Sequence, residues 1–198
     1  MAPNSITNGL GHASGELPNS TLAAQLVDSL TRGKQHPNHQ DRADFESLLQ
    51  ILEADKKGEQ LVDIIEEVEE SAKLIDVVVK AGLDPLFREN PFEGQDNLAK
   101  QASRSLGAIE ITIRRCPEVL LFQSVGHQAG ARLCGPLYLW LVPKLLVVAS
   151  NEQQRELRST VAAVLQTSMA VEHRLRSKGA GFPRIFRYIQ GCIKGKLP

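Results

Sequence analysis

Apolar residues recur along most of this chain at alternating steps of three and four, which is the spacing of one face of an α-helix. The longest stripe has acidic residues and Lys73 on its other side, so it predicts an amphipathic helix. Its apolar members are Leu61, Ile65, Val68, Ala72, Ile75 and Val79, and its polar members are Glu66, Glu67, Glu69, Glu70 and Lys73. A second stripe predicts a helix over residues 96–115, which ends before Pro117 because the residue preceding a proline is pushed away from helical angles. That stripe consists of Leu98, Ala102, Leu106, Ile109 and Ile113.

Four shorter segments predict further helices. Their apolar residues are Leu22, Leu26 and Leu30; Phe45, Leu48, Leu49 and Leu52; Leu157, Val161, Leu165 and Met169; and, over 182–189, Phe182, Phe186 and Ile189. Asn19 or Ser20 is suited to cap the first helix. We interpret Phe182 and Phe186, four residues apart, as a core stripe. No segment shows sustained alternation of apolar and polar residues, so we predict an all-α fold without a β-sheet.

Residues 133–149 are nearly all apolar, which leaves two interpretations. One is a membrane span, but the run is short for a bilayer and is interrupted by Pro136, Pro143 and Lys144. The other is a buried helix that begins at Pro143, because a proline in the first turn removes no helical hydrogen bond. We favour the buried helix and expect three of its residues to face the core: Leu141, Leu145 and Val148.

A short motif occurs twice. Residues 81–87 and 180–186 share the order Ala, Gly, large apolar, two variable positions, aliphatic and Phe, and the copies begin 99 residues apart. We expect Gly82 to end a helix in the left-handed conformation, and Pro85 to lie in the first turn of the next helix.

Other intervals also indicate a repeat. Pro143 aligns with Pro85 and, 41 residues further on, with Arg184. The pattern Ala102-x-x-x-Leu106 returns 59 residues later as Val161-x-x-x-Leu165. An interval of about 40 residues is typical of helical repeats, and we interpret residues 122–136 as an insertion that lengthens the other intervals.

At these positions the chain resembles armadillo-repeat proteins, in which a helix ending in Ala-Gly-aliphatic leads into a Pro-containing helix and then into one carrying Ala-x-x-x-Leu-Gly, here residues 102–107. The resemblance covers roughly residues 45–190 and implies a short armadillo/HEAT-like α-α superhelix. Residues 64–86 look most similar to the Smg-GDS type of small-GTPase dissociation stimulator, and nearly as similar to Fes-type exchange factors for heat-shock chaperones. The resemblance therefore implies a non-enzymatic protein-binding scaffold that regulates nucleotide exchange on a small GTPase, with a chaperone as the alternative partner.

Four regions are predicted along the chain. Residues 1–19 are poor in large apolar side chains, so we expect a disordered tail. A short helix and linker follow at 20–39, the armadillo-like domain occupies 40–192, and 193–198 form a basic C-terminal tail. Because only about three units fit into this length, the end units lack stacking partners, and self-association is one way to cover them.

Charge is balanced overall, with 23 Lys or Arg and 23 Asp or Glu, so no whole-molecule field attracts nucleic acid or an anionic membrane. It is segregated, however: residues 41–100 hold 16 acids against 7 bases, and residues 171–198 hold 7 Lys or Arg against Glu172 alone. Such blocks are typical of solvated faces, and the alternative is partner recognition. The candidates for binding a basic protein are Glu66, Glu67 and Glu70. The candidates for the alternative, an RNA-associated solenoid, are Arg174, Arg176, Arg184 and Arg187.

Signatures of enzyme chemistry are lacking in the sequence: it contains no nucleophile elbow, P-loop, zinc-protease or dinucleotide motif. Cys116, Cys134 and Cys192 are far apart, so we expect neither a metal site nor a disulfide framework. A thiol and imidazole pair from Cys116 or Cys134 with His127 or His173 is the alternative to a structural role for these residues. We expect no catalytic, cofactor-binding or metal-binding residues. Free thiols and the lack of a visible secretory signal suggest the cytoplasm, with the nucleus as the alternative.

Overall fold

Helices make up most of the described chain, which in this computed structural model comprises residues 19–32, 39–55, 67–87, 95–128, 131–177 and 185–195. The α-helices are α1 (Asn19–Arg32), α2 (His39–Asp55), α3 (Val68–Val78), α4 (Gln95–Arg115), α5 (Tyr138–Ser150), α6 (Arg158–Ser177) and α7 (Ile185–Ile193). Shorter helical turns are the π-helical η1 (Val79–Leu83) and the 3-10 turns η2 (Asp84–Phe87), η3 (Pro117–Leu121) and η4 (Glu152–Leu157). The all-α class is confirmed. Apart from Asn19 at the start of α1, the predicted tail at residues 1–19 lies outside the described residues.

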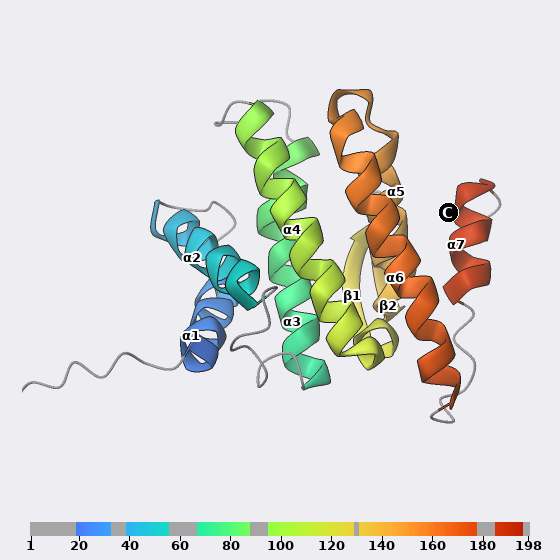
Figure 1. The fold of residues 1–198 in the computed structure, drawn as a ribbon, viewed down its shortest axis with the longest axis horizontal. Coiled ribbons are helices and arrows are strands. Elements are labelled where there is room, and N and C mark those ends of the chain that lie inside the picture. Colours follow the sequence, from blue (N-terminus) through green and yellow to red (C-terminus); the bar gives the residue numbers. More distant parts are fainter. Residues whose placement is uncertain are drawn as a thin grey trace, which may run out of the picture.

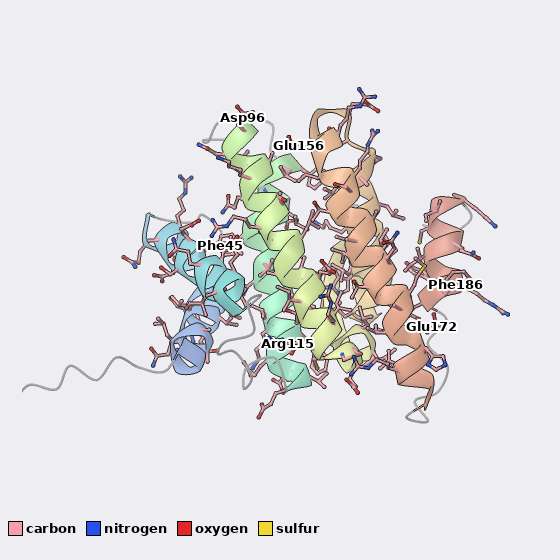
Figure 2. All side chains as sticks on the ribbon, viewed as in Figure 1. Phe45, Asp96, Arg115, Glu156, Glu172 and Phe186 are labelled. Atoms are coloured by element: carbon pink, nitrogen blue, oxygen red, sulfur yellow. The ribbon has the colours of Figure 1, made fainter. Side chains whose placement is uncertain are left out.

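Two helical hairpins form the centre of the molecule (Figure 1). Helices α4 and α6 lie side by side and run in the same direction, since Asp96 in the first turn of α4 and Glu156 just before α6 lie at the top, and Arg115 and Glu172 lie lower down (Figure 2). Helix α3 packs on α4, and α5 packs on α6. At one end of this row α1 and α2 cover α3 and α4, and at the other end α7 covers α5 and α6.

One continuous core extends from Ala23 in α1 to Ile189 in α7. The stripes predicted for α2 and α4 are buried throughout, as are Leu141, Leu145 and Val148 of α5. The stripe predicted for α1 is wrong at Leu22, which is 37% exposed. Ala23 and Val27 are buried instead, so α1 is rotated slightly to face both α2 and α3. Of the longest stripe, Ala72, Ile75 and Val79 are buried, Val68 is partly buried, and Leu61 and Ile65 lie outside the described residues.

Gly82 does not adopt the left-handed conformation predicted for it. It lies inside η1, and the chain remains right-handed helical at the next residues, with Asp84 at φ −61° and ψ −32°. The reason for glycine here is space: a Cβ on Gly82 would lie 2.0 Å from the Oγ and 2.7 Å from the Cβ of Ser105 in α4. Close packing of α4 against η1 therefore replaces the helix-ending role that the sequence suggested.

A β-hairpin corrects the prediction that there is no sheet. Strands β1 (Gln123–Gln128) and β2 (Ala131–Pro136) pair antiparallel, with Val125 opposite Cys134. Both of those side chains are exposed. Because this face of the hairpin is not buried, its strands lack the alternation of apolar and polar residues by which a strand is predicted from sequence. The hairpin is held against α5 by a hydrogen bond from Trp140 Nε1 to Ser124 Oγ at 2.7 Å. It occupies most of the segment that we interpreted as an insertion.

Pro143 lies inside α5, so the prediction that it begins the helix is wrong. The helix begins at Tyr138, after the N–H of Leu137 donates to the carbonyl of Phe122 at 2.9 Å. A proline at this interior position cannot donate to the carbonyl four residues earlier, which belongs to Leu139. That carbonyl instead accepts a hydrogen bond from the hydroxyl of Tyr188 in α7 at 2.7 Å.

The residues aligned at an interval of 59 are buried on neighbouring helices. Ala102 and Leu106 lie in α4, and Val161 and Leu165 lie in α6. The second copy of the Ala-Gly motif falls mostly in residues 178–184, outside the described chain. The superhelical repeat stays a prediction.

Candidate functional site

The acidic candidates lie at the start of α3. Glu67 occupies the N-cap position in an extended conformation and makes no side-chain capping hydrogen bond. Glu69 and Glu70 follow in the first turn, where their side chains are 66% and 32% exposed. Glu66 lies outside the described residues. Carboxylates at a helix N-terminus also interact favourably with the helix dipole, so this position has a structural benefit of its own.

Lys73 is the cation that faces this acidic group from its own helix. Its Nζ lies 2.7 Å from Glu70 Oε1 and 3.2 Å from Glu69 Oε1, and these contacts raise the pKa of Lys73, the Glu70 hydrogen bond most of all. One ammonium group therefore faces two carboxylates, and Glu67 adds a third. The start of α3 is an exposed patch of negative charge, which we call the acidic patch and define as Glu67, Glu69 and Glu70.

The basic candidates lie on different helices. Arg174, near the end of α6, is exposed and donates from Nη1 to the carbonyl of Arg114 in α4 at 3.3 Å. Arg187 is exposed on α7. Arg184 and the side chain of Arg176 lie outside what the structure describes. The prediction that Phe186 belongs to a core stripe is wrong, because it is 45% exposed beside Arg187, while Ile185 and Ile189 are buried.

The polar contacts that hold α7 were not foreseen from the sequence. Glu172 of α6 is only 3% exposed, and its carboxylate accepts a hydrogen bond from the N–H of Phe186 at the start of α7, at 2.8 Å. The rings of Tyr138 and Tyr188 meet edge to face at 5.5 Å. Burial, followed by the influence of Cys192, raises the pKa of Tyr188 to about 12. Burial also raises the pKa of Tyr138, with a smaller contribution from Glu172.

A pocket of about 180 Å³ lies between α2 and α4 and was also missed from the sequence. Its walls include Leu49, Leu52 and Glu53 of α2 and Arg104, Gly107 and Ile111 of α4. We call it the α2–α4 pocket. No motif marks it, because its walls come from segments about 50 residues apart in the chain.

Arg104 links the two walls of the α2–α4 pocket. It forms a bidentate pair with Glu53, at 2.5 Å from Nε and 3.0 Å from Nη2. Its Nη1 also donates to both carboxylate oxygens of Glu46, at 2.7 and 2.8 Å. These contacts, led by the Glu53 hydrogen bond, raise the pKa of Arg104 and keep it cationic. The only advance sign was the spacing of Glu46 and Glu53, which puts both on one face of α2.

The described residues contain no group of three or more His, Cys, Asp or Glu side chains placed to hold a metal ion. None of the described helices combines the length and apolar character that crossing a membrane requires. Cys116 is buried, whereas Cys134 and His173 are exposed, and the side chain of His127 lies outside the described part. The chain matches no protein-family model, no curated protein and no solved structure.

Proposed function

We propose that this chain is a non-enzymatic protein-binding module with an armadillo-like arrangement of helices, and that its acidic patch contacts a basic segment of the partner. The observation that carries the proposal is the cluster of three carboxylates at the start of α3, where Glu67 and Glu69 are exposed and Glu70 is partly buried beside Lys73. All three acids also lie where the helix dipole favours carboxylates, so binding of the partner, and not helix stability, is the property that tests the proposal.

The two neighbouring hairpins support the architectural part of the proposal. Helices α3 and α4 pack against each other, and α4 also packs against α6 of the next pair, which is how repeat proteins build a continuous core. Such stacked hairpins leave long exposed faces for binding. The class of function proposed is therefore a scaffold for protein partners.

Charge reversal at the acidic patch tests the proposal. The partner is first identified by crosslinking to the full chain. Replacing Glu67, Glu69 and Glu70 together by Lys should lower the affinity for that partner by about tenfold or more, because several opposite-charge contacts become repulsive. The wild-type affinity should also fall as salt is raised. A matched control, with Asp96→Lys, Glu152→Lys and Glu156→Lys, makes the same charge change elsewhere and should leave binding unchanged. Equal affinity of both variants and the wild type would remove the acidic patch from the proposal.

The kind of partner is open to a direct assay. A regulator of a small GTPase should speed release of a fluorescent guanine nucleotide from the purified GTPase, and a chaperone exchange factor should do so for an adenine nucleotide on a heat-shock ATPase. Exposed Phe186 beside Arg187 favours a second candidate, because such a pair is suited to stack on a base and contact phosphate. That RNA-binding candidate predicts binding to mixed RNA that weakens steeply with salt and is lost in Phe186→Ala.

A further inference from the structure

The floor of the α2–α4 pocket is apolar. Leu49 and Leu52 are at most 3% exposed, and Ala108 and Ile111 are at most 9% exposed. With a volume of about 180 Å³, the pocket is smaller than the roughly 300–1,000 Å³ of sites for drug-sized ligands. Its size suits one side chain, and the apolar residues among its walls favour an aliphatic one.

Gly107 opens this pocket. It lies in the interior of α4, where glycine is a poor helix former, and it does not have the left-handed conformation that favours glycine. A Cβ at Gly107 would meet no other described atom within 4 Å, in contrast to Gly82, where Ser105 leaves no space. Neither backbone conformation nor packing among the described residues therefore requires glycine at position 107. What the missing side chain does provide is open space in the pocket wall.

The charged rim of the pocket is one cluster with an excess of one carboxylate: Glu53 and Arg104 line the pocket, and Glu46 lies next to them, paired with Arg104. Arg104 brings one positive charge against the two carboxylates of Glu46 and Glu53, whose side chains remain 48% and 47% exposed. The guanidinium is already engaged through its Nε, Nη1 and Nη2 atoms, so it is poorly placed to receive an acidic ligand. An occupant with a Lys or Arg beside its apolar side chain would complement this rim.

From these three observations we infer that the α2–α4 pocket binds an aliphatic side chain, of leucine size, from a basic helical segment of a partner protein. The side chain fills the space left by Gly107, and the neighbouring basic residue contacts Glu46 or Glu53. Apolar anchors that enter a pocket with charged groups around them are a common source of affinity at protein interfaces. This site is independent of the acidic patch, so either can fail alone.

A peptide titration of the full chain tests this inference. The probe is a short fluorescein-labelled helical peptide of alanine and lysine with one central leucine, followed by fluorescence anisotropy. Two copies serve as comparisons, one with serine in place of leucine and one with glutamate in place of every lysine. The leucine and lysine peptide should bind about tenfold more tightly than the serine copy, because burial of one leucine is worth at least that factor. It should also bind more tightly than the glutamate copy, whose carboxylates are repelled by Glu46 and Glu53.

Variants of the pocket wall identify the binding site. Gly107→Leu fills the pocket and should abolish the preference for leucine over serine, while Ala162→Leu, at an exposed position of α6, should keep it. Glu53→Gln should reduce the preference for lysine over glutamate about two- to fivefold and leave the leucine preference unchanged. If Gly107→Leu does not fold, as judged by circular dichroism, Ser103→Met fills the same pocket from another position.

Three results would overturn the inference: equal binding of the leucine and serine peptides by the wild type, an unchanged leucine preference in the filled variant, or equal binding of the lysine and glutamate peptides. Sedimentation velocity adds a fourth. A dimer of the wild type that disappears in Gly107→Leu would assign the pocket to a second copy of this chain instead of a partner protein.

Discussion

Gly82 lies where α4 crosses the π-helical turn that ends α3. The hydroxyl of Ser105 could rotate away from an added methyl group, but the Cβ of Ser105, at 2.7 Å from that methyl position, belongs to the backbone frame of α4. An alanine at position 82 would thus push two helices apart. The Ser105 hydroxyl is itself held by a hydrogen bond to the carbonyl of Gln101 at 2.8 Å.

The two helical glycines should respond in opposite ways to the same substitution. Gly82→Ala is expected to lower the free energy of unfolding by about 1–3 kcal/mol through overpacking. Gly107→Ala is expected to raise it by up to about 1 kcal/mol, because alanine is the better helix former and its Cβ has space. Urea denaturation of both variants measures these changes. A stabilised Gly82→Ala variant would mean that α4 and η1 are not packed this closely.

At the scale of elements, α7 is joined to the rest of the molecule partly through a defect in α5. Pro143 leaves the carbonyl of Leu139 without its usual helical donor, and Tyr188 supplies one from outside the helix. At the start of α7, the carboxylate of Glu172 in α6 accepts a hydrogen bond from the N–H of Phe186. A short helix is thereby attached by hydrogen bonds as well as by burial of Ile185 and Ile189.

A double-mutant cycle tests the link between Pro143 and Tyr188. Tyr188→Phe in the wild type should lower the free energy of unfolding by about 1–3 kcal/mol, because it leaves the Leu139 carbonyl without a hydrogen-bond donor. In the Pro143→Ala background the cost should be smaller by about 1 kcal/mol, since the new N–H of residue 143 reaches the same carbonyl. Urea denaturation of the four proteins gives the coupling. Strictly additive costs would show that the two residues do not share this acceptor.

At the scale of the whole molecule, the two ends of the helical row differ in the groups that hold them. Helix α2 is linked to α4 by the charges of Arg104, Glu46 and Glu53, whereas α7 is linked to α5 and α6 through tyrosines and Glu172. The two ends should therefore respond differently to alkaline pH.

Alkaline pH should loosen the α7 end first. The folded pKa of Tyr188, about 12, is above its ordinary value of 10, so folding favours the neutral hydroxyl. This contribution is fully present below pH 10 and is lost as the pH rises from about 10 to 12. The difference in the free energy of unfolding between the wild type and Tyr188→Phe should decrease between about pH 10 and 12. Over the same range, amide hydrogen exchange should become faster in α7 before it does in α1 and α2. A constant difference up to pH 12 would contradict the assignment.

Local patterns account for what the sequence predicted well. The apolar stripes of α2, α4 and α5 are buried as expected, and α4 ends beside Pro117 as expected. The sequence also indicated the acidic candidates Glu67 and Glu70, which prove to be near the start of α3, but it did not reveal Glu46, Glu53 and Arg104 around one pocket. Those three residues acquire a common role only when α2 packs on α4.

The amino-acid sequence by itself therefore determined the helical class and the buried face of most helices, because helical periodicity is expressed within a few turns of the chain. Tertiary structure alone decided the reason for Gly82, the position of Pro143 inside α5, the exposure of Phe186 and the short hairpin. Two of these depend on a neighbour that is distant in sequence: Ser105 for Gly82, and Tyr188 for the carbonyl freed by Pro143. The hairpin is held on α5 by the hydrogen bond from Trp140 to Ser124, 16 residues earlier in the chain. The physical reason is that steric space and hydrogen-bond partners are set by which helices meet, and the spacing of residues along one helix does not contain that information.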